Sequence, residues 1–282
     1  MNSNLIEKHA KSFYWASFFL SKEIFRKCSF LYNFCRTLDD IVDDDDKLEV
    51  KKQNFLKFKK DFINKNLNNP IIKEMRSIMK SENISQNIVI DLFDGVETDL
   101  EEKVYIKSKK DLLIYSYRVA GTVGLMMSKI LKVKNKAALK GAIDLGIAMQ
   151  LTNIARDVNE DKKRERKYIE QDFSSIQKTI KESEVFYQKS FNSISCIPLR
   201  SRFSVIVARR VYKKIGDYIL KRKNIENYNK AGKIYVPVIG KVLETLLSIF
   251  DFIKLLFVEE IIYDNHKSHN ILEEEINLNE RV

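Results

Sequence analysis

The sequence predicts an all-α protein that folds as a single-domain helical bundle. Its 282 residues include only 3 prolines and 8 glycines, fewer than the frequent tight turns of a β-sandwich or barrel require. Apolar residues recur at helical spacing along most of the chain,. No repeat, low-complexity linker or shift in composition marks a domain boundary. We therefore expect one domain over residues 1–268 and a polar tail over residues 269–282 that frays.

Each predicted helix is recognised by its own apolar pattern and breakers. Aromatic residues stand among polar ones before residue 20, and a second apolar pattern ends at the acidic run Asp43–Asp46. A lysine-rich amphipathic stretch follows, and Asn66–Pro70 is typical of a loop,. The predicted helices cover approximately residues 5–20, 22–44, 47–66, 71–80, 85–102, 109–132, 135–164, 175–195, 200–223 and 236–262.

Charge and cysteine content limit the classes of function. The formal net charge of +11 favours anionic partners such as phosphates, nucleic acid or an anionic membrane surface,. We expect no nucleic-acid binding, because zinc ligands, an RNP-like aromatic motif and a helix-turn-helix pattern are all missing. Cys28, Cys35 and Cys196 form no CxxC pair, which fits a reducing cytosol.

The apolar segments are too short for targeting or membrane-spanning roles. Residues 1–13 lack the apolar core of a signal peptide,. No run of 18 apolar residues occurs in the sequence,. We therefore expect a cytoplasmic protein, or one held peripherally at the inner face of the membrane.

An acidic stripe marks the second predicted helix. At about 100° per residue, Tyr32, Arg36, Asp39 and Asp43 fall on one face, with Asp40 at its edge,. Carboxylates at i, i+4 repel each other, and a divalent cation relieves the repulsion. Oxygen ligands of this kind suit Mg²⁺. A solvated helix end is the alternative, but acidic residues at a helix C-terminus oppose the helix dipole.

A second polar stripe lies on the helix predicted at 135–164. Gln150, Asn153, Asp157 and Asp161 are spaced by 3, 4 and 4 residues, so they form one line on an otherwise apolar helix,. Buried polar groups without partners cost about 1–3 kcal/mol each. This line therefore requires a polar occupant, either ions and ligand or another polar stripe.

Two such stripes facing each other across a bundle would hold divalent ions between them. Basic side chains lie near both in sequence, namely Arg36, Arg156, Arg164 and Arg166. Metals and cations together stabilise the charge that develops on a leaving diphosphate. The pattern therefore indicates metal-assisted ionisation of a diphosphate.

With these stripes, the sequence resembles the squalene and phytoene synthases. Cys35–Asp43 is similar to that family's first aspartate-rich motif, and Gln150–Asp161, continuing to Arg166 and Tyr168, is similar to the second. Further similar segments are Tyr115–Gly124, the weaker acidic segment Asp94–Leu100, His9–Phe13 and Ala208–Gly216. In order and spacing they cover about residues 9 to 240, and together they are highly specific.

The resemblance implies a fold of the isoprenoid synthase type with a large central cavity. The sequences of Ala120–Met127 and Gln150–Asp157 are most similar to those of bacterial phytoene synthases. These enzymes join two geranylgeranyl diphosphates through a cyclopropyl intermediate. A squalene or dehydrosqualene synthase acting on farnesyl diphosphate is the alternative. A non-catalytic family member serving in assembly is the second alternative, although both aspartate stripes are intact.

The resemblance also assigns roles to individual residues. The metal ligands implied for Mg²⁺, or for Mn²⁺ in its place, are Asp39, Asp40, Asp43, Asn153, Asp157 and Asp161. Tyr32, Tyr117 and Tyr212 are implied as phenols that face a carbocation. The residues implied to bind the prenyl diphosphate substrate are His9, Lys11, Ser12, Arg36, Gln150, Asn153, Arg156, Arg166 and Tyr168. Neither NADPH nor an obligate protein partner is expected.

Several positions stay open between function and ordinary packing. Departures from the family pattern at Ala10, Ser116, Glu170 and Lys233 leave substrate preference uncertain. Cavity walls and ordinary core are both compatible with Phe13, Val119, Ala120, Ala148 and Leu151. Gly121 and Gly124 allow either a close substrate or close helix packing. His266 and His269 have metal-like spacing but lie in the polar tail, so we expect no metal there.

The helix that includes Val242–Ile262 is a separate case. Its polar residues form a narrow stripe, which leaves a wide apolar arc,. Burial of this arc is the preferred interpretation. Contact with a lipid surface is the alternative.

Overall fold

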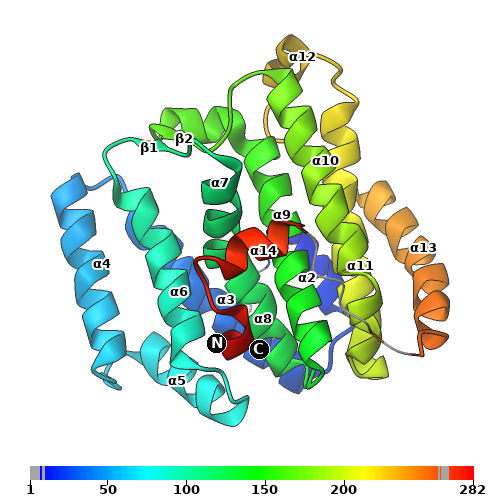
Figure 1. The fold of residues 1–282 in the computed structure, drawn as a ribbon, viewed down its shortest axis with the longest axis horizontal. Helices are drawn as coiled ribbons and strands as arrows, with labels where there is room; N and C mark the ends of the chain where they lie inside the picture. Colours follow the sequence, from blue (N-terminus) through cyan, green and yellow to red (C-terminus); the bar gives the residue numbers. More distant parts are fainter. Residues whose placement is uncertain (1–6, 8–9, 260, 262–266) are drawn as a thin grey trace.

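The computed structural model describes Glu7, residues 10–259, Ile261 and residues 267–282. These residues form a helical bundle (Figure 1), which confirms the predicted all-α class. In chain order, the α-helices are α2 (Lys11–Ser17), α3 (Lys22–Asp43), α4 (Leu48–Ile63), α5 (Pro70–Ser81), α6 (Gln86–Glu97), α7 (Lys109–Ser116), α8 (Thr122–Ile130), α9 (Lys136–Lys163), α10 (Phe173–Lys189), α11 (Leu199–Leu220), α12 (Ile225–Lys230), α13 (Val238–Leu256), α14 (Lys267–Glu273) and α15 (Leu278–Arg281).

Short irregular elements join these helices. A π-helical turn, η2 (Tyr117–Gly121), connects α7 to α8, and the 3₁₀ turns η1 (Thr98–Leu100) and η3 (Asn192–Cys196) follow α6 and α10. The two-residue strands β1 (Val104–Tyr105) and β2 (Arg166–Lys167) pair in parallel. They tie the loop after η1 to the end of α9.

The long helix α9 lies at the centre and organises the packing around it. It contacts α8, η2, α10 and α11. The side chain of Asn135 accepts the backbone N–H of Ala138 and caps its start, as asparagine does at helix N-termini. Small residues allow the closest approach, because a Cβ added at Gly146 would lie 2.2 Å from the carbonyl oxygen of Ala120.

Gly124 on α8 serves this same contact. A Cβ added at Gly124 would lie 2.3 Å from the carbonyl oxygen of Ala142 on α9. Of the two roles left open, close helix packing is the one that the backbone distance at Gly124 requires. A side chain at Gly124 would push α8 away from α9. At Gly121, an added Cβ would lie 3.1 Å from side-chain carbons of Ile143 and Tyr117, which does not decide between the two roles.

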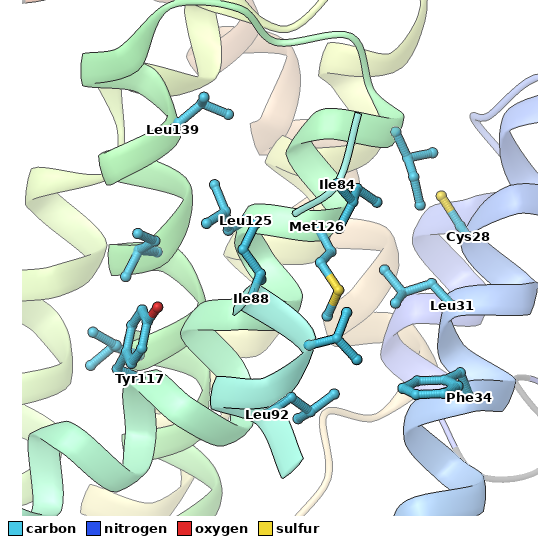
Figure 2. Close-up of a cluster of buried hydrophobic side chains, with 14 of the residues drawn as sticks. Cys28, Leu31, Phe34, Ile84, Ile88, Leu92, Tyr117, Leu125, Met126 and Leu139 are labelled. Carbon is cyan, nitrogen blue, oxygen red and sulfur yellow. The ribbon is translucent and has the colours of Figure 1, made fainter. Parts of the chain in front are cut away.

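The apolar core joins helices from both ends of the chain. Figure 2 shows part of it, in which Cys28, Leu31 and Phe34 of α3 lie near Ile88 and Leu92 of α6. The rings of Phe34, Phe62 and Phe93 cluster with centroids 5.3–6.0 Å apart, at separations that favour aromatic pairs. This core holds α3 against α6.

The C-terminal residues are packed into this core, so the expected frayed tail was wrong. Leu272 and Leu278 are fully buried. His269 is also buried, and its Nε2 lies 2.5 Å from Asp144 Oδ1 of α9. Most residues of this segment are polar or acidic, so its few apolar residues were too sparse to indicate from the sequence that it packs into the core. His266 lies outside the described residues.

Helix α13 is inverted relative to an ordinary surface helix, so the preferred burial of its apolar arc was wrong. Its buried face carries Glu244, Ser248 and Asp251, whereas its apolar side chains are exposed. Arg210 of α11 pairs with Glu244 and Asp251. Within the described part of the chain, no helix is both long and apolar enough to cross a membrane.

The contact between α15 and α6 gives a prediction about stability. Arg281 donates to both carboxylate oxygens of Asp91 at 2.8 and 3.2 Å, and the Tyr117 hydroxyl donates to Asp91 Oδ2 at 2.8 Å. Arg281→Ala would leave the buried Asp91 carboxylate without its cation, at a cost of about 3 kcal/mol of unfolding free energy. Urea denaturation measures this loss.

The neighbouring residue provides the control. Glu280 has an exposed side chain and lies 3.6 Å from Arg281. Glu280→Ala should change the unfolding free energy by no more than about 0.5 kcal/mol. Equal losses in the two variants would contradict a specific role of the Asp91–Arg281 pair.

Candidate active site

A cavity of about 760 Å³ opens inside the bundle. Its walls come from α2, α3, α6, η1, α7, η2, α8, α9, β2, η3 and α11, with Lys233 and Tyr235 from the segment before α13. One part of the wall is apolar and includes Phe13, Val119 and Ala120. Acidic and basic side chains line another part. The cavity therefore combines space for an apolar chain with a charged region.

The acidic stripe of α3 contributes Asp39 and Asp43 to the charged region. Ser21 caps α3 by accepting the backbone N–H of Ile24, and the helix continues to Asp43. The uninterrupted helix places Tyr32, Arg36, Asp39 and Asp43 along the cavity wall. Asp40 does not line the cavity. Its exposed side chain pairs with Arg36 at 2.5 Å.

The polar stripe of α9 faces the same cavity with Gln150, Asn153, Asp157 and Asp161. The amide nitrogen of Asn153 donates to Gln150 Oε1 at 3.4 Å, and its buried Oδ1 has no hydrogen-bond partner among the described residues. The two stripes predicted from the sequence therefore line one cavity.

The Asp99 carboxylate adds an anchor that the sequence indicated only weakly. It lies in η1 and accepts hydrogen bonds from the hydroxyls of Tyr168 at 2.6 Å and Tyr115 at 2.9 Å. The rings of Tyr115 and Tyr168 stack with centroids 4.8 Å apart. The sequence signal for Asp99 was its place in the weaker acidic segment Asp94–Leu100. The sequence signal for Tyr115 was only that it begins the similar segment Tyr115–Gly124.

Arginines bridge the carboxylates of the cavity. Helix α9 ends at Lys163, and the chain turns at Glu165, whose φ of 56° is left-handed, before it enters β2. This turn places Arg166 Nη1 2.9 Å from Asp43 Oδ1, and Arg164 also pairs with Asp43. Arg156 makes a bidentate pair with Asp157, at 2.8 and 2.6 Å.

The environment raises the pKa of carboxyl groups on both stripes. Burial among protein atoms, together with the charge of the neighbouring Asp43, raises the pKa of Asp39 to about 7. Burial and the charge of Asp157 likewise raise the pKa of Asp161 to about 7. Among the described residues, neither Asp39 nor Asp161 forms an ion pair. These are the carboxylates that most need a cation.

The pKa values of basic and phenolic groups in the cavity are also shifted. Burial opposes the charge of Arg166, but Asp99 and Asp43 outweigh it and raise the pKa of that guanidinium. Burial raises the pKa of Tyr32 to about 12 and also raises the pKa of Tyr212. Both phenols therefore stay neutral at physiological pH.

Most of the predicted site residues line this cavity. They are Lys11, Ser12, Tyr32, Arg36, Asp39, Asp43, Gln150, Asn153, Arg156, Asp157, Asp161, Arg166, Tyr168 and Tyr212. The structure does not support the predicted roles of two others. Tyr117 is fully buried outside the cavity, because its hydroxyl bonds to Asp91, and Asp40 points to solvent. His9 lies outside the described residues. Ala148 and Leu151 are core residues.

The donor set suits a hard cation such as Mg²⁺, although the carboxylates are arranged around arginines. Among the described residues, no three acidic, histidine or cysteine side chains converge closely enough to hold a metal ion. Asp43 and Asp157 are turned toward Arg166 and Arg156. Nevertheless, Asp39, Asp161 and the buried Asn153 Oδ1 offer oxygen ligands of the type that Mg²⁺ prefers,.

The sequence comparisons identify the family. The family model described as squalene/phytoene synthase matches residues 6–175. The 15-cis-phytoene synthase of Pantoea ananas is 30% identical over 240 residues, which cover 73% of this chain and 77% of that protein. The 15-cis-phytoene synthase of Paracoccus sp. is 32% identical over 195 residues, covering 61% and 64%. The chain belongs to the squalene/phytoene synthase family, and it is a prenyltransferase.

Solved structures place the fold in the same group. A dehydrosqualene synthase bound to a ligand superposes with a TM-score of 0.70 at 26% identity, covering 88% of this chain and 94% of that one. Squalene synthase HpnC from Alicyclobacillus acidocaldarius has the same fold, with a TM-score of 0.63 at 15% identity over 78% and 90% of the two chains. The predicted isoprenoid synthase bundle with a central cavity is confirmed.

The raised pKa values predict how the metal-free protein responds to pH. Because the folded pKa of Asp39 and Asp161 is about 7 and the unfolded value is about 4, folding is favoured at low pH. This contribution is lost as pH rises from about 4 to about 7. Asp39→Asn and Asp161→Asn remove the cost, so each should raise Tm at pH 8 by several °C, at about 2–4 °C per kcal/mol.

Thermal unfolding without divalent metal, from pH 5 to pH 8, measures this effect. Asp44→Asn, at the exposed end of α3, is the control and should leave Tm unchanged. If the Tm of Asp39→Asn at pH 8 is equal to or below that of the wild type, the ionised Asp39 carboxylate does not destabilise the folded protein.

The different positions of Tyr212 and Tyr117 predict different kinetic effects. Tyr212 lines the cavity beside Asn153 and Arg156, so Tyr212→Leu, which removes the aromatic face, should lower kcat by about tenfold or more. Tyr117→Phe removes a buried hydrogen bond and should lower the unfolding free energy by about 1 kcal/mol, with kcat preserved. Steady-state kinetics and urea denaturation of both variants test this contrast. A large loss of kcat in Tyr117→Phe, with kcat preserved in the Tyr212 variant, would show that Tyr117 belongs to the active site.

Proposed function

We propose that this prenyltransferase joins two molecules of geranylgeranyl diphosphate head to head to form phytoene. The observation that carries the proposal is the cavity in which the Asp39–Asp43 and Asp157–Asp161 carboxylates lie next to an apolar wall. The similarity to 15-cis-phytoene synthases supports the choice of substrate. The product is proposed to enter carotenoid biosynthesis.

The charged region would hold the diphosphate groups. Asp39, Asp43, Asn153, Asp157 and Asp161 would hold Mg²⁺, or Mn²⁺ in its place, and the metal would neutralise the charge of the diphosphate when bound. For the two paired carboxylates to reach an ion, their arginines must change partners. Arg156 and Arg166 would then be free to pair with phosphate oxygens, which suit the planar guanidinium.

The remaining cavity residues would guide the chemistry of the prenyl chains. Loss of the first diphosphate leaves an allylic carbocation, which the double bond of the second chain attacks. Loss of a proton then closes a cyclopropyl diphosphate, and a second ionisation, rearrangement and proton loss give the product. The neutral phenols of Tyr32 and Tyr212 are suited to face these cations without capturing them, because aromatic faces stabilise cations. No step requires NADPH.

The second candidate is a dehydrosqualene synthase that uses farnesyl diphosphate. The superposition on a dehydrosqualene synthase at a TM-score of 0.70 favours it. The two reactions differ in chain length but use the same charged region. Apolar wall residues such as Phe13 and Val119 would therefore decide between them.

A product assay distinguishes these reactions. Purified protein with MgCl₂ receives geranylgeranyl or farnesyl diphosphate, with and without NADPH, and mass spectrometry identifies the extracted hydrocarbon. We expect a forty-carbon product from geranylgeranyl diphosphate that does not depend on NADPH. Asp39→Asn and Asp157→Asn should abolish it, whereas Asp44→Asn should not.

The other outcomes separate the alternatives. A thirty-carbon product alone would replace the proposal with the farnesyl reaction, as dehydrosqualene without NADPH or as squalene with it. Folded protein that yields no product from either substrate would favour a non-catalytic role in assembly.

A further inference from the structure

The outer surface of α13 is almost entirely apolar. We call this surface the apolar face of α13; its exposed residues are Val238, Ile239, Val242, Leu243, Leu246, Ile249, Phe250, Ile253, Leu256 and Phe257. Ile239 is 84% exposed and Phe257 is 79% exposed. Soluble proteins rarely expose a continuous apolar surface of this extent unless it binds something.

Ion pairs hold α13 with this face outward. Arg210 of α11 donates to Glu244 at 2.9 Å and to Asp251 at 2.8 Å. Ser248 is fully buried between these two positions. Rotation of α13 to bury its apolar side chains would expose or unpair this network. The outward orientation therefore follows from the polar contacts on the inner side.

The charges that remain on the outside of α13 are positive. Of its four charged residues, Glu244 and Asp251 are turned inward, which leaves Lys241 and Lys254. Neither lysine forms an ion pair among the described residues. A surface with apolar side chains and cations complements an anionic lipid surface, where basic side chains meet the headgroups.

Aromatic side chains extend the surface from α13 to α2. Trp15 donates its indole N–H to Thr245 of α13 at 2.9 Å, and its ring lies 6.0 Å from the Lys241 ammonium. Phe18, 65% exposed, packs edge-on against Trp15. Tryptophan is typical of the region between lipid headgroups and acyl chains.

We propose that the apolar face of α13 lies in the headgroup region of an anionic lipid bilayer, with Lys241 and Lys254 against the lipid phosphates. The helix would lie along the membrane rather than cross it, because its inner face is bound to α11 through Arg210. A second copy of the chain fits less well. Antiparallel pairing about the middle of α13 would bring Lys241 of one copy close to Lys254 of the other.

Flotation with lipid vesicles tests the proposal on the full-length protein. The vesicles contain phosphatidylcholine alone or with about 30% phosphatidylglycerol, which supplies the negative surface potential. We expect the wild type to float with the anionic vesicles. Leu246→Ser, Phe250→Ser and Ile253→Ser combined should reduce the bound fraction about tenfold or more. Lys241→Glu with Lys254→Glu should weaken binding to anionic vesicles specifically.

The control replaces equally exposed apolar residues far from α13. Leu56, Ile63 and Leu67 lie on α4 and the loop after it, at the opposite end of the bundle (Figure 1). The combined change of these three to serine should leave flotation unchanged. Circular dichroism verifies that each variant is folded.

A second measurement uses Trp15, the single tryptophan of the chain. Lipids brominated on their acyl chains should quench its fluorescence in the wild type and not in the Leu246, Phe250, Ile253 variant. The proposal fails if the wild type does not float, or if that variant binds vesicles as well as the wild type does. It also fails if α13 mediates a dimer, detected by analytical ultracentrifugation, that the same variant dissociates while vesicles bind neither protein. The cavity shares no residue with the apolar face of α13, so vesicle binding is independent of the proposed reaction.

Discussion

The structure depends on the repulsion among carboxylates that α3, η1 and α9 present to one cavity. Asp39 and Asp161 are held among protein atoms with like charges nearby, and their pKa values rise to about 7 as a result. Asp43 and Asp157 form ion pairs with Arg166 and Arg156. The bundle therefore carries unfavourable electrostatic energy inside, where an ordinary protein would place apolar side chains.

Packing contacts elsewhere in the fold offset this electrostatic cost. The apolar core holds α3 against α6, and the glycine contacts bring α8 and α9 into van der Waals range. The pairing of β1 with β2 fixes Arg166 and Tyr168 beside Asp43 and Asp99. These contacts position the elements that carry the carboxylates around the cavity.

Sequence patterns predicted the features that depend on helical spacing. The stripes of α3 and α9 could be found because each lies within one uninterrupted helix, where spacing fixes direction. Tyr117 could not be placed this way, since the π-helical turn shifts the spacing at that point and Asp91, distant in sequence, binds its hydroxyl. For α13, periodicity located both faces but could not decide which one is buried, because that depends on Arg210 in another helix. The packed C-terminus was missed for a similar reason.

The link between Asp91 and Arg281 joins residues separated by 190 positions. Contacts this distant form late, because a long loop must close before they are made. On the ribosome, the helices that surround the cavity emerge well before Arg281 can reach α6. The newly made protein must therefore pass through a stage in which α15 does not yet cover Asp91 and Tyr117. We expect chaperone dependence and sensitivity to proteases to be greatest in that interval.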